Sequence, residues 1–90
     1  MNKSTREQHL ADALRRVEEL APKLAHDLRG ALNVVSGYAD LLALESSGPL
    51  NPRQKKFVQE IRGGADKAQR EIDACLERLL SLVQSESRVK

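Results

Sequence analysis

The sequence predicts an all-α protein, an antiparallel two-helix hairpin that dimerises into a four-helix bundle. Apolar residues recur at alternating spacings of four and three in both halves of the chain, as they do in helices that pack in a bundle. Of the 90 residues only Tyr38 and Phe57 are aromatic, so the core is expected to be aliphatic and helical. A Ser-, Gly- and Pro-containing segment separates the two halves, which predicts one turn between two helices.

The first helix is expected to run to about Glu45. Residues 1–20 are expected to form a helical leader, with Ser4 or Thr5 as its cap. Pro22 removes one backbone donor within the pattern, but the heptad phase continues across it. A kink is therefore favoured over a stop, and a frayed amino-terminal segment is the alternative. The apolar seam of this helix consists of Leu10, Leu14, Val17, Ala21, Leu24, Leu28, Ala31, Val35, Tyr38 and Leu42.

The turn is expected at residues 46–51. Asn51 offers a side-chain oxygen as N-cap, and Pro52 suits the first position of a helix because its missing N–H is not needed there. Gln54 completes a reciprocal capping arrangement with Asn51. The second helix is therefore expected to begin at Pro52.

This second helix is expected to span residues 52–84, and the polar residues 85–90 are expected to fray. Its apolar stripe is wider than a narrow seam, so one hairpin covers only part of it, and two hairpins are expected to form a homodimer. Cys75 lies on this stripe and is expected to be a small buried apolar residue, not a reactive thiol or a metal ligand. The stripe consists of Val58, Ile61, Ala65, Ala68, Ile72, Cys75, Leu79 and Leu82, widened by Phe57, Leu76, Leu80 and Val83.

The charge and hydropathy patterns make nucleic acid and membranes poor candidates as partners. Fifteen Lys and Arg oppose 13 Asp and Glu, and the two signs are interspersed along both helices. No apolar run approaches the length of a membrane span, and the amino terminus has no signal-peptide core. A soluble cytoplasmic protein with no metal or cofactor of its own is expected.

His26 lies at the centre of a polar face in the first helix. In the heptad frame it takes position f, which points away from the seam, so the imidazole is expected in solvent. A lone exposed histidine is by default an ordinary surface residue, but a neutral imidazole also presents a nucleophilic nitrogen lone pair. Asp27 is adjacent to it, and Arg29 and Asn33 follow on or near the same face, where each has an ordinary surface role as its alternative.

The segment from His26 to Asn33, His-Asp-Leu-Arg-Gly-Ala-Leu-Asn, followed by Gly-Tyr-Ala-Asp-Leu-Leu at residues 37–42, resembles the H-box of sensor histidine kinases. The resemblance extends over about residues 20–84, which places a dimerisation and histidine phosphotransfer domain at residues 21–84. The second half resembles the family through Gln54, Phe57, Ile61, Ala65, Asp66, Ile72 and Leu76.

The resemblance implies a role for each residue around the histidine. His26 would be the phosphoacceptor, and Asp27 would act as an acid or base or orient the tautomer of the ring. The partner-binding positions it implies are Arg29, Gly30 and Asn33.

Two residues depart from the family pattern. Gly30 stands where family members that dephosphorylate their partner have Thr or Asn, so this route to phosphatase activity lacks its side chain. Ala31 replaces the usual Pro, which removes the family's kink from this position.

The ATP-binding domain that follows in a complete kinase does not fit after Gln84, so no autokinase activity is expected from this chain alone, and whether it is an enzyme stays open.

The function that the resemblance implies is phosphoryl exchange between His26 and an aspartate of a response-regulator receiver domain, with Mg²⁺ carried by the receiver. The expected partners are a second copy of the chain, a receiver domain and, as a further candidate, the ATP-binding domain of a histidine kinase in trans. One alternative is a non-catalytic helical scaffold or inhibitor that binds a receiver or a kinase. Another is a fragment of a complete sensor kinase; the initial Met favours a free-standing protein.

Overall fold

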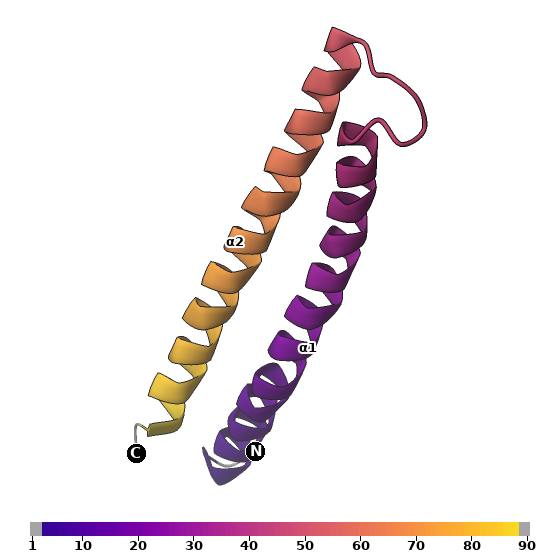
Figure 1. Cartoon of the computed structure of the whole chain (residues 1–90). Coiled ribbons are helices and arrows are strands. Elements are labelled where there is room, and N and C mark those ends of the chain that lie inside the picture. Colours follow the sequence, from indigo (N-terminus) through magenta and orange to yellow (C-terminus); the bar gives the residue numbers. More distant parts are fainter. Residues whose placement is uncertain (1–2, 89–90) are drawn as a thin grey trace.

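The computed structural model is a hairpin of two antiparallel helices, α1 at Lys3–Ala43 and α2 at Pro52–Arg88, which confirms the predicted all-α class (Figure 1). The structure describes residues 3–88, and side-chain burial for residues 5–85. Both ends of the chain lie at one end of the hairpin and the loop lies at the other. Over the described residues, neither helix has a stretch apolar enough to cross a membrane.

The hairpin is a rod and not a closed globule. Its extents are 67 × 18 × 16 Å and its radius of gyration is 20.3 Å, whereas a compact domain of this length has a radius of gyration of about 12 Å. Among the described residues no large side chain is fully buried. The buried apolar residues are Ala25, Ala39, Val58, Ala65 and Val83.

Pro22 lies inside α1 without ending it. The residues before it that the structure describes are helical, so the alternative of a frayed amino-terminal segment is not observed. In Figure 1 the indigo turns of α1 overlap one another while its magenta turns are spread along the axis, so the helix changes direction, as a proline within a helix predicts. The expected cap is wrong, because α1 already includes Lys3, and Ser4 and Thr5 therefore lie within the helix.

A left-handed residue, Glu45, ends α1 with a φ of 58°. The Ser46 N–H donates to the Leu41 carbonyl at 3.3 Å, the six-to-one bond that closes a helix around such a residue. The Glu45 carboxylate accepts a bond from the Leu50 N–H at 3.2 Å and lies 3.6 Å from the Lys55 ammonium. One residue therefore both reverses the chain and ties the loop to the start of α2.

The predicted cap of α2 is confirmed. The Gln54 N–H donates to Asn51 Oδ1 at 2.8 Å, and the Asn51 N–H donates to Gln54 Oε1 at 2.9 Å. The predicted end is wrong, because α2 continues beyond Gln84 to Arg88. Ser and Glu beyond Gln84 include no helix breaker, so nothing in the sequence stops the helix there; residues 89–90 lie outside the described part of the chain.

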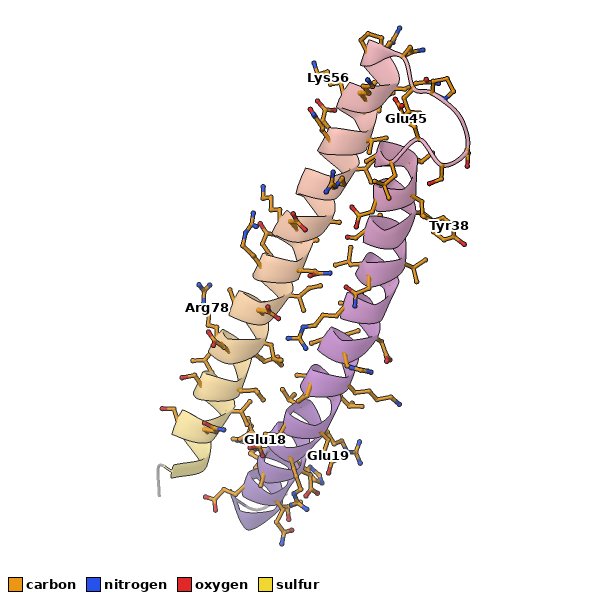
Figure 2. All side chains as sticks on the ribbon, viewed as in Figure 1. Glu18, Glu19, Tyr38, Glu45, Lys56 and Arg78 are labelled. Atoms are coloured by element: carbon orange, nitrogen blue, oxygen red, sulfur yellow. The ribbon has the colours of Figure 1, made fainter. Side chains whose placement is uncertain are left out.

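The face of α1 that packs on α2 differs from the predicted seam after Ala21. Ala25 and Ala39 are buried against α2, with Leu32 and Ser36 half-buried between them. The seam residues stay exposed because the small alanines bring the helices close on a neighbouring face, and Tyr38 points away from α2 (Figure 2). The exposed seam residues after Ala21 are Leu24, Leu28, Ala31, Val35, Tyr38 and Leu42.

The exposed seam borders an apolar groove of about 350 Å³ between the two helices. Cys75 lines this groove and is exposed, so its predicted burial is wrong for the hairpin alone. The hairpin leaves this side uncovered because only two helices are present. With Cys75, the groove is lined by Ala21, Leu24, Ala25, Leu28, Ala68, Glu71, Ile72, Leu76 and Leu79; we call this side the apolar flank.

Candidate functional site

Polar side chains join α1 to α2 along the other side of the hairpin, which we call the polar flank. Each step from Arg29 to Asn33 and on to Asp40 along α1 is matched by an equal step back along α2, as antiparallel helices require. The pairs between the helices are Arg29 with Asp73, Gln69 Nε2 donating to Asn33 Oδ1 at 2.9 Å, and Arg62 Nε with Asp40 Oδ1 at 3.0 Å. Beyond the end of α1, Glu45 lies 3.6 Å from Lys55 of α2.

His26 lies on this polar flank and is exposed, as its heptad position predicts. It precedes Asn33 by two helical turns, which puts both residues on one face of α1. No hydrogen bond or ion pair joins the ring to any described residue. The imidazole is therefore accessible to another macromolecule.

Asp27 is exposed, and no hydrogen bond joins it to His26 among the described residues. Consecutive side chains on a helix point about 100° apart, so the two groups diverge in the free hairpin. Hydrogen bonds of catalytic groups are often absent until a partner is bound. The acid, base or orienting role of Asp27 therefore stays a prediction.

Arg29 and Asn33, the two predicted partner-binding side chains, are both held by α2. The Arg29 Nε and Nη2 groups donate to the same Asp73 Oδ1, with Nε at 2.8 Å, and the Arg29 side chain is 38% exposed. The Asn33 amide oxygen accepts from Gln69. The sequence did not indicate Asp73 or Gln69; the available signal was their spacing of four residues, which matches that of Arg29 and Asn33.

Gly30 has no side chain, so the backbone of α1 is uncovered one helical turn after His26. It is exposed, and a Cβ built there would meet no atom within 4 Å, so no contact within the hairpin requires glycine. The same holds for Gly37, two turns further along the same face. Backbone is therefore accessible next to His26.

These observations define a class: an all-α hairpin with one exposed nucleophilic histidine on a polar flank and an uncovered apolar flank. The family model of the His Kinase A (phospho-acceptor) domain matches residues 16–87, so the chain belongs to this family. Membership confirms the resemblance drawn from the H-box and implies a phospho-acceptor function in two-component signalling. No curated protein and no solved structure matches the chain.

Proposed function

We propose that the chain is a histidine phosphotransfer module that exchanges a phosphoryl group between His26 and an aspartate of a response-regulator receiver domain. The chain has two histidines, His9 and His26, and only His26 lies within the family match. Its ring is exposed and unpartnered among the described residues. This exposed nucleophile, the histidine that lies within the family match, carries the proposal.

In the proposed exchange a neutral ring nitrogen of His26 attacks the phosphorus of an aspartyl phosphate. The N–P bond forms as the P–O bond breaks, and the receiver carboxylate leaves with the electron pair of that bond. Asp27 is proposed to accept a hydrogen bond or the proton from the other ring nitrogen. In-line phosphoryl transfer depends mainly on positioning and on neutralisation of charge, so an exposed ring that a partner approaches directly suits it.

The receiver is proposed to supply Mg²⁺. Within the described residues no three His, Cys, Asp or Glu side chains are grouped so that they could hold a metal ion. The ATP-binding domain of a histidine kinase, acting in trans in the cytoplasm, is the second proposed partner, because the family resemblance implies such a domain as a donor of the phosphoryl group.

The receiver is proposed to dock on α1 beside Gly30 and Gly37. Each glycine within a helix costs about 1 kcal/mol relative to Ala, and no neighbouring atom in the hairpin accounts for it. Val34 and Leu41 lie on the same side and are 59% and 51% exposed. A partner helix could approach closely over Gly37 and cover these two apolar side chains, with position 30 at the edge of the contact next to His26.

The apolar flank is proposed to bind a second copy of the chain. It joins exposed side chains of α1, such as Leu24 and Leu28, to exposed Cys75 and Leu79 of α2. Contiguous apolar surface of this kind favours association, and two hairpins that share it form a four-helix bundle. The polar flank, which carries His26, would remain at the outside of such a dimer.

The test is to mix the purified chain with a panel of phosphorylated receiver domains and measure acid-labile label. We expect one or more receivers to transfer label to the chain. Binding to a receiver without any label transfer would favour the scaffold alternative.

A further inference from the structure

We infer that Asp73 is a positioning residue for the phosphoryl exchange at His26, acting through Arg29. In the unphosphorylated chain it holds the guanidinium against α2, and it releases the guanidinium to the phosphoryl group once His26 carries one. This inference rests on the proposed phosphoacceptor role of His26.

The first support is the position of Arg29. It lies three residues after His26, and side chains at this spacing are neighbours on a helix surface. Arg29 is also half-buried on the face of α1 that packs on α2, where it lies between buried Ala25 and half-buried Leu32. Arg29 therefore reaches both the other helix and the space beside the histidine.

The second support is how Asp73 holds Arg29. The Arg29 Nε and Nη2 groups each donate one hydrogen bond, and both bonds go to the same carboxylate oxygen of Asp73. The remaining guanidinium N–H groups make no bond to a described residue. The guanidinium is thus fixed by one anion while it keeps free donors for another.

The phosphoryl group is the stronger competitor for Arg29. It carries nearly two negative charges and three acceptor oxygens, and Arg binds phosphate through paired, charge-assisted bonds. Asp73 offers one negative charge on a side chain that is 59% exposed, and exposed ion pairs contribute little to stability. Phosphorylation of His26 should therefore draw Arg29 away from Asp73.

Thermodynamic linkage makes this competition measurable. If phosphorylation weakens the bond between Arg29 and Asp73, loss of that bond must favour phosphorylation to the same extent. Asp73→Asn should thus raise the equilibrium fraction of phosphorylated chain, and Arg29→Ala should lower it. In a chain that already carries Arg29→Ala, Asp73→Asn should not change the phosphorylated fraction.

Asp66 provides a matched control. It lies on the same face of α2, two helical turns before Asp73, and is exposed with no bond to a described residue. Asp66→Asn removes the same charge from the same helix. Any difference between the two variants therefore reports the contact with Arg29 and not the net charge.

The experiment equilibrates the full chain with a phosphorylated receiver and measures the fraction of the chain that is labelled. Five proteins are compared: wild type, Asp73→Asn, Asp66→Asn, Arg29→Ala, and the double variant that combines Arg29→Ala with Asp73→Asn. We expect Asp73→Asn to raise the equilibrium constant about two- to fivefold over Asp66→Asn, and the double variant to match Arg29→Ala. Thermal unfolding of each variant checks that the hairpin persists.

Equal labelling of Asp73→Asn and Asp66→Asn would overturn the inference while leaving the proposed function intact. So would a gain from Asp73→Asn that persists without Arg29. A wild-type chain that accepts no label from any receiver would instead refute the proposed function, and the inference with it.

Discussion

Leu24 and Ala25 are consecutive in α1, yet Leu24 is 61% exposed whereas Ala25 is 4% exposed. The larger apolar side chain is thus the one in solvent, and the smaller one packs on α2. The same contrast recurs 14 residues later, about four helical turns along α1, between exposed Tyr38 and buried Ala39. The hairpin contact therefore uses small residues, and the larger apolar side chains remain available to another surface.

This arrangement predicts that the wild-type chain is a dimer and that Leu24→Glu weakens it. A glutamate on the apolar flank would bury a charge in the dimer but cost little in the free hairpin. We expect the dimer dissociation constant to rise more than tenfold, measured by light scattering across concentrations. Leu44→Glu is the control, because Leu44 lies beyond the end of α1 and is 77% exposed. A wild-type chain of monomeric mass at micromolar concentration, with full helicity, would contradict the dimer.

Gly30→Thr should introduce phosphatase activity toward the receiver. The family resemblance implies that a polar side chain at this position orients the attacking water, and a Cβ at Gly30 meets no atom within 4 Å. Loss of phosphate from the receiver should be faster with Gly30→Thr than with wild type. Gly30→Ala separates this effect from helix propensity: both variants should be more stable than wild type, Thr by a few tenths and Ala by about 1 kcal/mol. Wild-type phosphatase activity equal to that of the Thr variant would refute the assignment.

Glu45 should show two opposing effects on stability. Glu45→Ala removes the acceptor of the Leu50 N–H and the partner of Lys55 while keeping the left-handed backbone, and should cost about 1 kcal/mol. Glu45→Gly loses the same contacts but relieves the backbone, so it should be more stable than the Ala variant by about 1 kcal/mol. Chemical denaturation of the three proteins measures the order. An Ala variant more stable than the Gly variant would show that the left-handed conformation is not strained.

Asn51 and Gln54, which cap α2 reciprocally, should make coupled contributions to the free energy of unfolding. Asn51→Ala should lower the free energy of unfolding by about 1 kcal/mol, because the Gln54 N–H loses its acceptor. Adding Gln54→Ala should cost less in that variant than in wild type, since the two side chains form one reciprocal arrangement. Strict additivity in denaturation of the four proteins would argue against the coupling.

The local features of the fold could be predicted from the sequence. The start of α2 follows from Asn51, Pro52 and Gln54, whose capping chemistry involves only neighbours in the chain. Passage of α1 through Pro22 follows from the unbroken heptad phase. The end of α2 could not be predicted, because polarity alone neither stops nor continues a helix.

The contacts between the two helices could not be predicted from the sequence. A wide apolar stripe does not say which part of it packs within one hairpin. The predicted seam and Cys75 are therefore exposed in the single hairpin, where a neighbouring face of α1 packs on α2. The exposure of His26 could be predicted because it depends on the helical period alone. The bond between Arg29 and Asp73 joins residues 44 positions apart and depends on the register of the two helices, which no local pattern contains.

The central claim is that His26 accepts the phosphoryl group, and the most direct measurement is acid-labile labelling of His26→Gln by a phosphorylated receiver. We predict that this variant takes no label while His9→Gln labels as wild type. Both should bind the receiver with nearly wild-type affinity, because the His26 ring makes no contact within the described hairpin and its loss leaves the fold intact. Undiminished labelling of His26→Gln would contradict the account.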